Sequence, residues 1–311
     1  MKMMFALYKS PHFILLLLLL FWKGTFAQTG NNNSESKILA ADAKLVLIDS
    51  SFSFTEGPAT DKAGNIFFTD QPNDNIWEYN IDGKLSLFMH GAKRSNGMYF
   101  DAKGNLISCA DESNQLIAIS SKKKITVLIK DYKSHILNGP NDVWVSPSGG
   151  MYITDPYYQR DYWTRKNADS ALGGEKLYYF SPAKKQLIRV DSTTVKPNGI
   201  VGTADGKYLY VADMGKHATY RYDVNKDGTL SNKQLFVNEA SDGMTIDNRG
   251  NIYLTGNGVI VYNATGEKIE HIKVPEKWTA NVCFGGKDKN ILFITASKSV
   301  YIIPTLLKGV E

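Results

Sequence analysis

Six short polar motifs of this sequence place an oxygen-bearing side chain at the same distance from a turn. Glu56, in the motif EGP, lies eight residues before the turn glycine Gly64, and five later turns have an Asn or Asp at the same offset. The six side chains are Glu56, Asn96, Asn141, Asn198, Asp242 and Asn281. Carboxylate and amide oxygens without Cys or His are the ligands of a hard divalent cation. The set therefore indicates a cation site, Ca²⁺ first, with Mg²⁺ or Mn²⁺ as alternatives and Zn²⁺ as a poorer native fit.

Turn formation is the alternative explanation of these motifs. Short polar residues before Gly commonly form turns where strands begin. Turn chemistry does not require a Glu at position 56, however, and burying Glu56 and Asp242 close together is costly unless a cation lies between them. The cation hypothesis accounts for the whole set.

A repeated turn and strand positions these side chains. The first two of the six segments read DKAGNIFFTD and DAKGNLISCAD. The turn positions of successive segments are 40, 45, 57, 44 and 39 residues apart. Each is followed by a further pair of strands, which gives four short strands per repeat. Six such repeats predict an all-β fold, a six-bladed β-propeller. Because the first strand of each blade lines the central channel, the six side chains should converge at one end of it.

The chain divides into three predicted parts. Residues 1–27 combine Lys2 and Lys9 with the apolar run FILLLLLLFW and a small-residue cleavage pattern, which predicts a signal peptide. Residues 28–43 are predicted to be a flexible leader, and 44–311 the propeller, with the strand 44–49 pairing with the last blade. The protein is thus expected to be exported to the periplasm or the outside and to have no membrane contact after cleavage.

Composition excludes some partners. The formal charge is +5, and it falls to +2 without the three lysines of residues 1–27, so nothing indicates nucleic-acid binding. Cys109 and Cys283 fall in blades two and six, too far apart for a disulfide, and should be buried free thiols. A small-molecule substrate and a monomer are expected.

The motifs EGP, NGM, NGPND…YITDP, PNGI, SDGM and NVCFGG…LFITAS, over residues 45–303, resemble those of the senescence-marker-protein/gluconolactonase/luciferin-regenerating-enzyme family. The resemblance implies a six-bladed propeller with a divalent cation in the channel, usually Ca²⁺. It implies Glu56, Asn198 and Asp242 as metal ligands, with Asn141 as fourth ligand or substrate contact. Members typically hydrolyse lactones of sugar acids, and a minority cleave phosphoesters.

A cation would polarise a lactone carbonyl and stabilise the oxyanion formed on attack. Asp242 and Asn141 are the predicted catalytic residues. Asp242 acts as the base, or else serves only as a ligand while a water on the cation attacks; the sequence leaves both open. Asn96 and Asn281 either bind a sugar hydroxyl or a water, or only order the channel.

Two positions depart from the family pattern. Gly139 stands where animal aldonolactonases have a substrate-binding arginine, and Ala110-Asp111 stands where bacterial relatives have Glu-His. The long interval 155–176 carries Tyr157 and Arg160, which we predict to bind substrate over the channel. Its alternative role is a surface loop packed by its own aromatic residues.

The leading hypothesis is an exported metal-dependent hydrolase that opens a sugar-acid lactone. The alternatives are a non-catalytic ligand-binding propeller with a structural cation, and a phosphotriesterase-like hydrolase at the same site. The segment DVNKDGTLSNKQ, 223–234, mimics an EF-hand loop but lacks its final Glu, so a hairpin is expected there.

Overall fold

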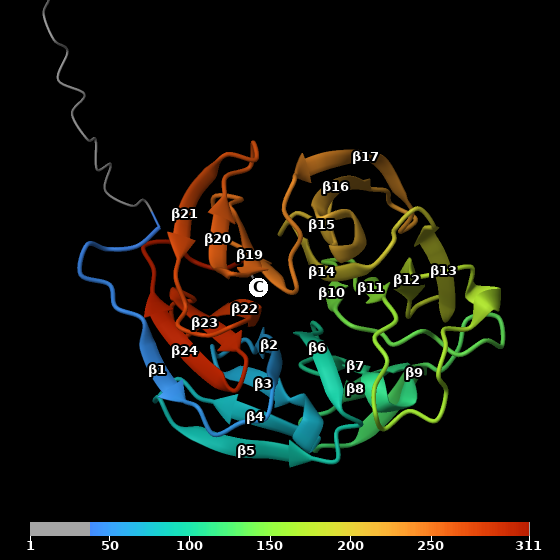
Figure 1. Ribbon diagram of the computed structural model, residues 1–311, viewed down its shortest axis with the longest axis horizontal. Helices are drawn as coiled ribbons and strands as arrows, with labels where there is room; N and C mark the ends of the chain where they lie inside the picture. Colours follow the sequence, from blue (N-terminus) through green and yellow to red (C-terminus); the bar gives the residue numbers. More distant parts are fainter. Residues whose placement is uncertain (1–37, 311) are drawn as a thin grey trace, which may run out of the picture. The chain divides into compact units, whose positions relative to one another are not determined.

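The fold is a ring of six four-stranded antiparallel sheets, as the sequence predicts (Figure 1). The computed structural model describes residues 38–310. In blades one to five the strands follow chain order from the channel outward, and blade six differs only in its outer strand. Blade one consists of β2 (Thr55–Thr60), β3 (Ile66–Asp70), β4 (Asn75–Tyr79) and β5 (Leu85–His90). Blade two consists of β6 (Ser95–Phe100), β7 (Leu106–Ala110), β8 (Gln115–Ile119) and β9 (Ile125–Ile129). Blade three consists of β10 (Val143–Val145), β11 (Met151–Asp155), β12 (Lys176–Ser181) and β13 (Gln186–Asp191).

The second half of the ring repeats this plan. Blade four consists of β14 (Pro197–Gly202), β15 (Tyr208–Asp213), β16 (Ala218–Val224) and β17 (Leu230–Val237). Blade five consists of β18 (Met244–Ile246), β19 (Ile252–Gly256), β20 (Gly258–Tyr262) and β21 (Lys268–Ile272). Blade six consists of β22 (Thr279–Gly285), β23 (Ile291–Ala296), β24 (Ser299–Pro304) and β1 (Val46–Asp49). Four 3₁₀ turns complete the elements, namely η1 (Gln71–Asn73), η2 (Asp111–Ser113), η3 (Ser170–Leu172) and η4 (Met214–Lys216).

Strand β1 closes the ring. It pairs antiparallel with β24, with Val46 opposite Ile302, so the last blade takes its outer strand from the start of the propeller. The expected pairing of strand 44–49 with blade six is therefore confirmed, and β24 gains a partner on its outer edge.

The predicted leader, 28–43, is only partly within the described residues. Ile38 is buried among the side chains of blade six, and its carbonyl accepts a hydrogen bond from Leu306 N at 2.8 Å. Residues 38–43 thus pack on the propeller, because Ile38, Leu39 and Ala43 supply apolar surface that the polar composition of the leader obscured. The predicted signal peptide lies outside the described residues.

The core lies between the blades. Both cysteines are buried thiols that form no disulfide with each other, as expected: Cys109 belongs to the cluster between blades two and three, and Cys283 to the cluster that joins blades six and one. No helix within residues 38–310 is long and apolar enough to cross a membrane.

Candidate functional site in the channel mouth

Backbone irregularities present the six side chains to the channel. The β2–β3 pairing shifts register between Glu56 and Ala59, and comparable shifts occur in blades two, four and six. A bulge of this kind turns a side chain out of the regular alternation of a strand. In blades three and five the corresponding residues, Asn141 and Asp242, lie two residues before the inner strand begins. The end of the channel at which these residues lie is called the channel mouth below.

Glycines after the ring residues allow neighbouring blades to approach. Gly57 has a φ of +41°, and a Cβ there would lie 2.0 Å from the carbonyl oxygen of Asn96. A Cβ at Gly243 would lie 2.0 Å from Cγ of Asn281. A side chain at position 57 would clash with the backbone of blade two and separate the blades, whereas one at position 243 would displace the side chain of Asn281.

Five of the six ring residues line one pocket of about 260 Å³ at the channel mouth. They are Glu56, Asn96, Asn141, Asn198 and Asp242. Asn281 lies behind them, where its Nδ2 donates to Oε2 of Glu56 at 3.4 Å and its Oδ1 accepts from Val282 N at 2.8 Å. The predicted convergence of the ring therefore holds, with Asn281 as a supporting neighbour of Glu56.

Glu56 is buried and Asp242 is half-buried, and the two carboxylates are close enough to repel each other. Burial, followed by the charge of Asp242, raises the pKa of Glu56 well above its usual value. Burial also raises the pKa of Asp242 to about 6, although hydrogen bonds from Trp278 and Asn198 act in the opposite direction. The pocket thus concentrates negative charge that nearby protein groups only partly offset.

Two amide oxygens in the pocket have no partner. Asn198 donates through Nδ2 to Asp242 Oδ1 at 2.8 Å and to the Tyr158 hydroxyl at 3.2 Å, and its buried Oδ1 accepts no hydrogen bond. The buried Oδ1 of Asn96 also lacks one within the described chain. Because buried acceptors are almost always satisfied, these two oxygens are groups to which an electropositive ligand could bind.

The donor set fits a hard cation. Two carboxylates and the unpartnered amide oxygens are oxygen ligands of the kind that Ca²⁺ takes. Residues 38–310 contain no group of three or more His, Cys, Asp or Glu side chains that could hold a metal, so a cation at this place would depend on the amides.

The long interval 155–176 contributes both predicted and unexpected contacts. Arg160 lines the pocket, whereas the hydroxyl of Tyr157 donates to Gln159 and its ring packs on Trp163, 5.8 Å between centroids. Tyr158 lines the pocket instead, and burial raises its pKa to about 12. The segment thus packs on its own aromatic residues and also reaches the pocket, while substrate binding by Tyr157 and Arg160 stays a prediction.

Sequence reasoning missed several lining residues. Trp278 donates through Nε1 to Asp242 Oδ2 at 2.6 Å, and the others are Phe54, Gln71, Tyr158 and Met214. Gln71 and Met214 each directly follow the second strand of a blade, so the register of the repeat could have located them. Nothing in the repeat marks Trp278, which lies in the connection before β22.

Known proteins with similar sequences and folds have lactonase names. A gluconolactonase from Zymomonas mobilis is 26% identical over 88% of this chain and 84% of its own length. A pentonolactonase from Haloferax volcanii is 31% identical over 65% of this chain and 66% of its own length. The structure of a gluconolactonase from Xanthomonas campestris superposes with a TM-score of 0.79 at 25% identity, over 86% of this chain and 91% of that one.

The family is established by a match that covers most of the chain. The sequence profile of the SMP-30/Gluconolactonase/LRE-like region matches residues 21–298, a span that includes all six ring residues and the channel mouth. The chain therefore belongs to the SMP-30/gluconolactonase/LRE-like family.

Proposed function

We propose that this protein is a cation-dependent lactonase that opens a sugar-acid lactone at the channel mouth. Its lactonase relatives support the reaction class. The observation that carries the cation is the buried, unpartnered amide oxygen of Asn198 beside the carboxylates of Glu56 and Asp242.

Glu56, Asn198 and Asp242 would hold the cation, with Asn141 as the fourth ligand. A divalent cation at this place supplies polarisation of the lactone carbonyl and balances the negative charge that develops on its oxygen. We propose Ca²⁺, because hard oxygen ligands including neutral amides are its usual set.

Asp242 is held in a fixed orientation. Its Oδ1 accepts from Asn198 and its Oδ2 accepts from Trp278, so the carboxylate cannot rotate freely. In the proposed reaction a water oxygen attacks the carbonyl carbon and its proton passes to Asp242. The ring C–O bond then breaks, the former ring oxygen takes up a proton, and the product is a hydroxy acid.

Other residues of the pocket bind and orient the substrate in this proposal. Arg160 donates hydrogen bonds, and Asn96, Asn141 and the Tyr158 hydroxyl exchange them with the hydroxyl groups of a sugar-acid lactone. The pocket of about 260 Å³ admits a ligand of monosaccharide size.

Export is a separate proposal. It is supported by the basic start, the short apolar run and the small-residue pattern within residues 1–27. Amino-terminal sequencing of the protein secreted by its host would test it, with a mature terminus near Gln28 expected and an intact Met1 contradicting it.

Lactone hydrolysis by the purified protein tests the proposed reaction. Acid release from D-glucono-1,5-lactone and other aldonolactones would be followed in a pH-stat after EDTA treatment, with and without added Ca²⁺. We expect Ca²⁺ to restore turnover in the wild type and in Glu78→Gln, a matched change on β4, the third strand of blade one, but not in Glu56→Gln. Bound Ca²⁺ without turnover of any lactone would refute the lactonase and leave a binding propeller or a different hydrolase.

A further inference from the structure

Carboxylates at the ends of the second strands have a shared structural role in three blades. Asp70, Asp155 and Asp213 each end the second strand of their blade. Each accepts two backbone N–H hydrogen bonds, 2.8 to 3.2 Å long, from the segment that leads into the inner strand of the same blade. These aspartates therefore anchor the connections between blades.

Blade two departs from this plan. Ala110 occupies the strand-end position, paired with Ser95 as Asp70 is paired with Thr55. The carboxylate comes one residue later, at Asp111, in the position at which blades one and four place pocket-lining residues. Asp74, from blade one, accepts the backbone N–H of Arg94 at 2.6 Å and so anchors the entry to blade two. Asp111 therefore does not anchor the connection that leads into the inner strand of its blade.

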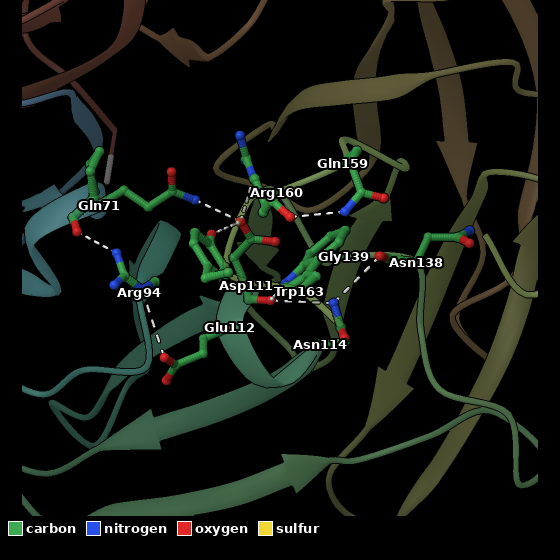
Figure 2. A network of polar contacts seen from close by, with 12 residues as sticks. Gln71, Arg94, Asp111, Glu112, Asn114, Asn138, Gly139, Gln159, Arg160 and Trp163 are labelled. Carbon is green, nitrogen blue, oxygen red and sulfur yellow. Dashed lines mark hydrogen bonds and ion pairs between the residues drawn. The ribbon is translucent and has the colours of Figure 1, made fainter. Parts of the chain in front are cut away.

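Asp111 instead accepts hydrogen bonds from side chains of two other blades (Figure 2). Its Oδ2 accepts from Arg160 Nε at 2.7 Å, from the Tyr162 hydroxyl at 2.6 Å and from Gln71 Nε2 at 2.8 Å. Its backbone carbonyl accepts from Trp163 Nε1 at 3.0 Å. Asp111 is 2% exposed, and three of these four contacts, with Arg160, Tyr162 and Trp163, fix one short stretch of the segment 156–175.

A glycine makes room for this contact. A Cβ on Gly139 would lie 2.8 Å from the ring of Trp163 and 3.1 Å from Oδ1 of Asp111. The indole fills the space that a side chain at position 139 would occupy. Packing and hydrogen bonding thus hold the same stretch of the segment in place.

The contact determines where Arg160 points. Nε binds Asp111, while the side chain lines the pocket and interacts electrostatically with Asp242 and Glu56. Among residues 38–310 no hydrogen bond involves the two terminal nitrogens of Arg160. Because Nε is bound to Asp111, the two terminal nitrogens of Arg160 are the donors that this side chain can offer to a ligand in the pocket.

We propose that Asp111 is a positioning residue that docks segment 156–175 on the channel mouth and directs the terminal nitrogens of Arg160 at the substrate. Asp111 then sets substrate affinity through Arg160 without touching the substrate. The kinetic part of this inference rests on the proposed lactonase function, whereas the docking part does not.

A double-mutant cycle tests the kinetic part. With D-glucono-1,5-lactone as probe, Asp111→Asn should raise KM about tenfold and change kcat little, because it weakens a charge-assisted contact that orients a binding side chain. In an Arg160→Ala background the same change should raise KM less than about twofold. Full additivity of the two effects, or an unchanged KM for Asp111→Asn, would overturn the inference.

Hydrogen exchange tests the docking part without any substrate. Peptides within 156–175 should exchange faster in Asp111→Asn than in the wild type. Asp191→Asn is the matched control, because Asp191 also accepts from a cation and a tyrosine hydroxyl, Lys233 and Tyr222, but does not line the pocket. It should leave exchange in this segment unchanged.

The outcomes separate the two proposals. If no lactone is hydrolysed, faster exchange still supports docking by Asp111, and unchanged exchange refutes it. Should Asp111→Asn fail to fold, Tyr162→Phe removes one of the three donors while keeping the ring, and a smaller change in the same direction is expected. Equal exchange in Tyr162→Phe and the wild type would then count against the inference.

Discussion

The acidic side chains in two regions of the propeller have opposite surroundings. At the channel mouth, Glu56 and Asp242 lie close together, and the pKa of each carboxyl is raised. At the boundary of blades three and four, Asp191 accepts hydrogen bonds from Lys233 Nζ at 2.7 Å, from the Tyr222 hydroxyl at 2.7 Å and from Thr193 N at 2.6 Å. There the hydrogen bonds outweigh burial, and the pKa of Asp191 falls to about 2.

The difference separates a structural acid from a functional one. Around Asp191 the protein supplies its own counter-charge, so the group joins two blades and needs nothing more. At the mouth the counter-charge is incomplete, and two amide oxygens are unpartnered as well. A fold that leaves buried polar groups in this state gives up stability, which is expected where a ligand restores it.

The same substitution at the two sites should therefore have opposite effects, and this is the largest difference that we predict. Asp242→Asn should lower lactone turnover by more than about 100-fold, since it removes a proposed ligand and base. It should leave the stability of the cation-free protein unchanged or higher, because it removes one of two like charges. Steady-state kinetics and urea unfolding measure both; equal activity of Asp242→Asn and the wild type would refute the assignment.

Added Ca²⁺ should stabilise the folded protein through the residues of the channel mouth and not through Asp191. At roughly 100 times its Kd, Ca²⁺ should raise the free energy of unfolding by about 2.7 kcal/mol, which corresponds to a Tm increase of roughly 5 to 10 °C for a domain of this size. Calorimetry of EDTA-treated protein would show the shift. Asp191→Asn should retain it and Glu56→Gln should lose most of it; an equal shift in Glu56→Gln would place the cation elsewhere.

Low pH should destabilise the protein through protonation of Asp191, at the boundary of blades three and four. Because the pKa of Asp191 is lower in the folded protein, its ionised form contributes stability above about pH 4, and this is lost as the pH falls toward 2. The lowering of nearly two pKa units corresponds to about 2 kcal/mol. In Asp191→Asn, unfolding free energy should depend less on pH in this window, with KM unchanged; an identical acid limb in both proteins would contradict the pairing.

The smallest effect is expected in the hairpin that mimics an EF-hand loop. Asp227 lies in the turn between strands β16 and β17 and accepts hydrogen bonds from Thr229 N and Oγ1. Asp227→Ala should leave the Ca²⁺-induced Tm shift within experimental error. A reduced shift would identify a second cation site and weaken the contrast drawn above.

The repeat made much of this predictable. An eight-residue offset from six turns located five residues of one pocket, because every blade presents the same register to the channel. The side chains outside the repeat were harder to find. Tyr158 and Trp278 lie in connections whose course depends on packing, and Asp111 was recognised only as a departure from a family pattern. Its importance emerges when its contacts are compared with those of Asp70, Asp155 and Asp213.

The closure of blade six by β1 and β24 has a consequence for the order in which the protein is made. β1 is among the first parts of the propeller to leave the ribosome, and its partner around Ile302 is among the last. Until then β1 has no partner strand, and Glu56 cannot meet Asn281 of the adjacent blade six. Pairing of such distant segments is slow, so ring closure should be the last step of folding. A chain that stops short of blade six would thus lack a finished channel mouth, and cation binding would report that synthesis is complete.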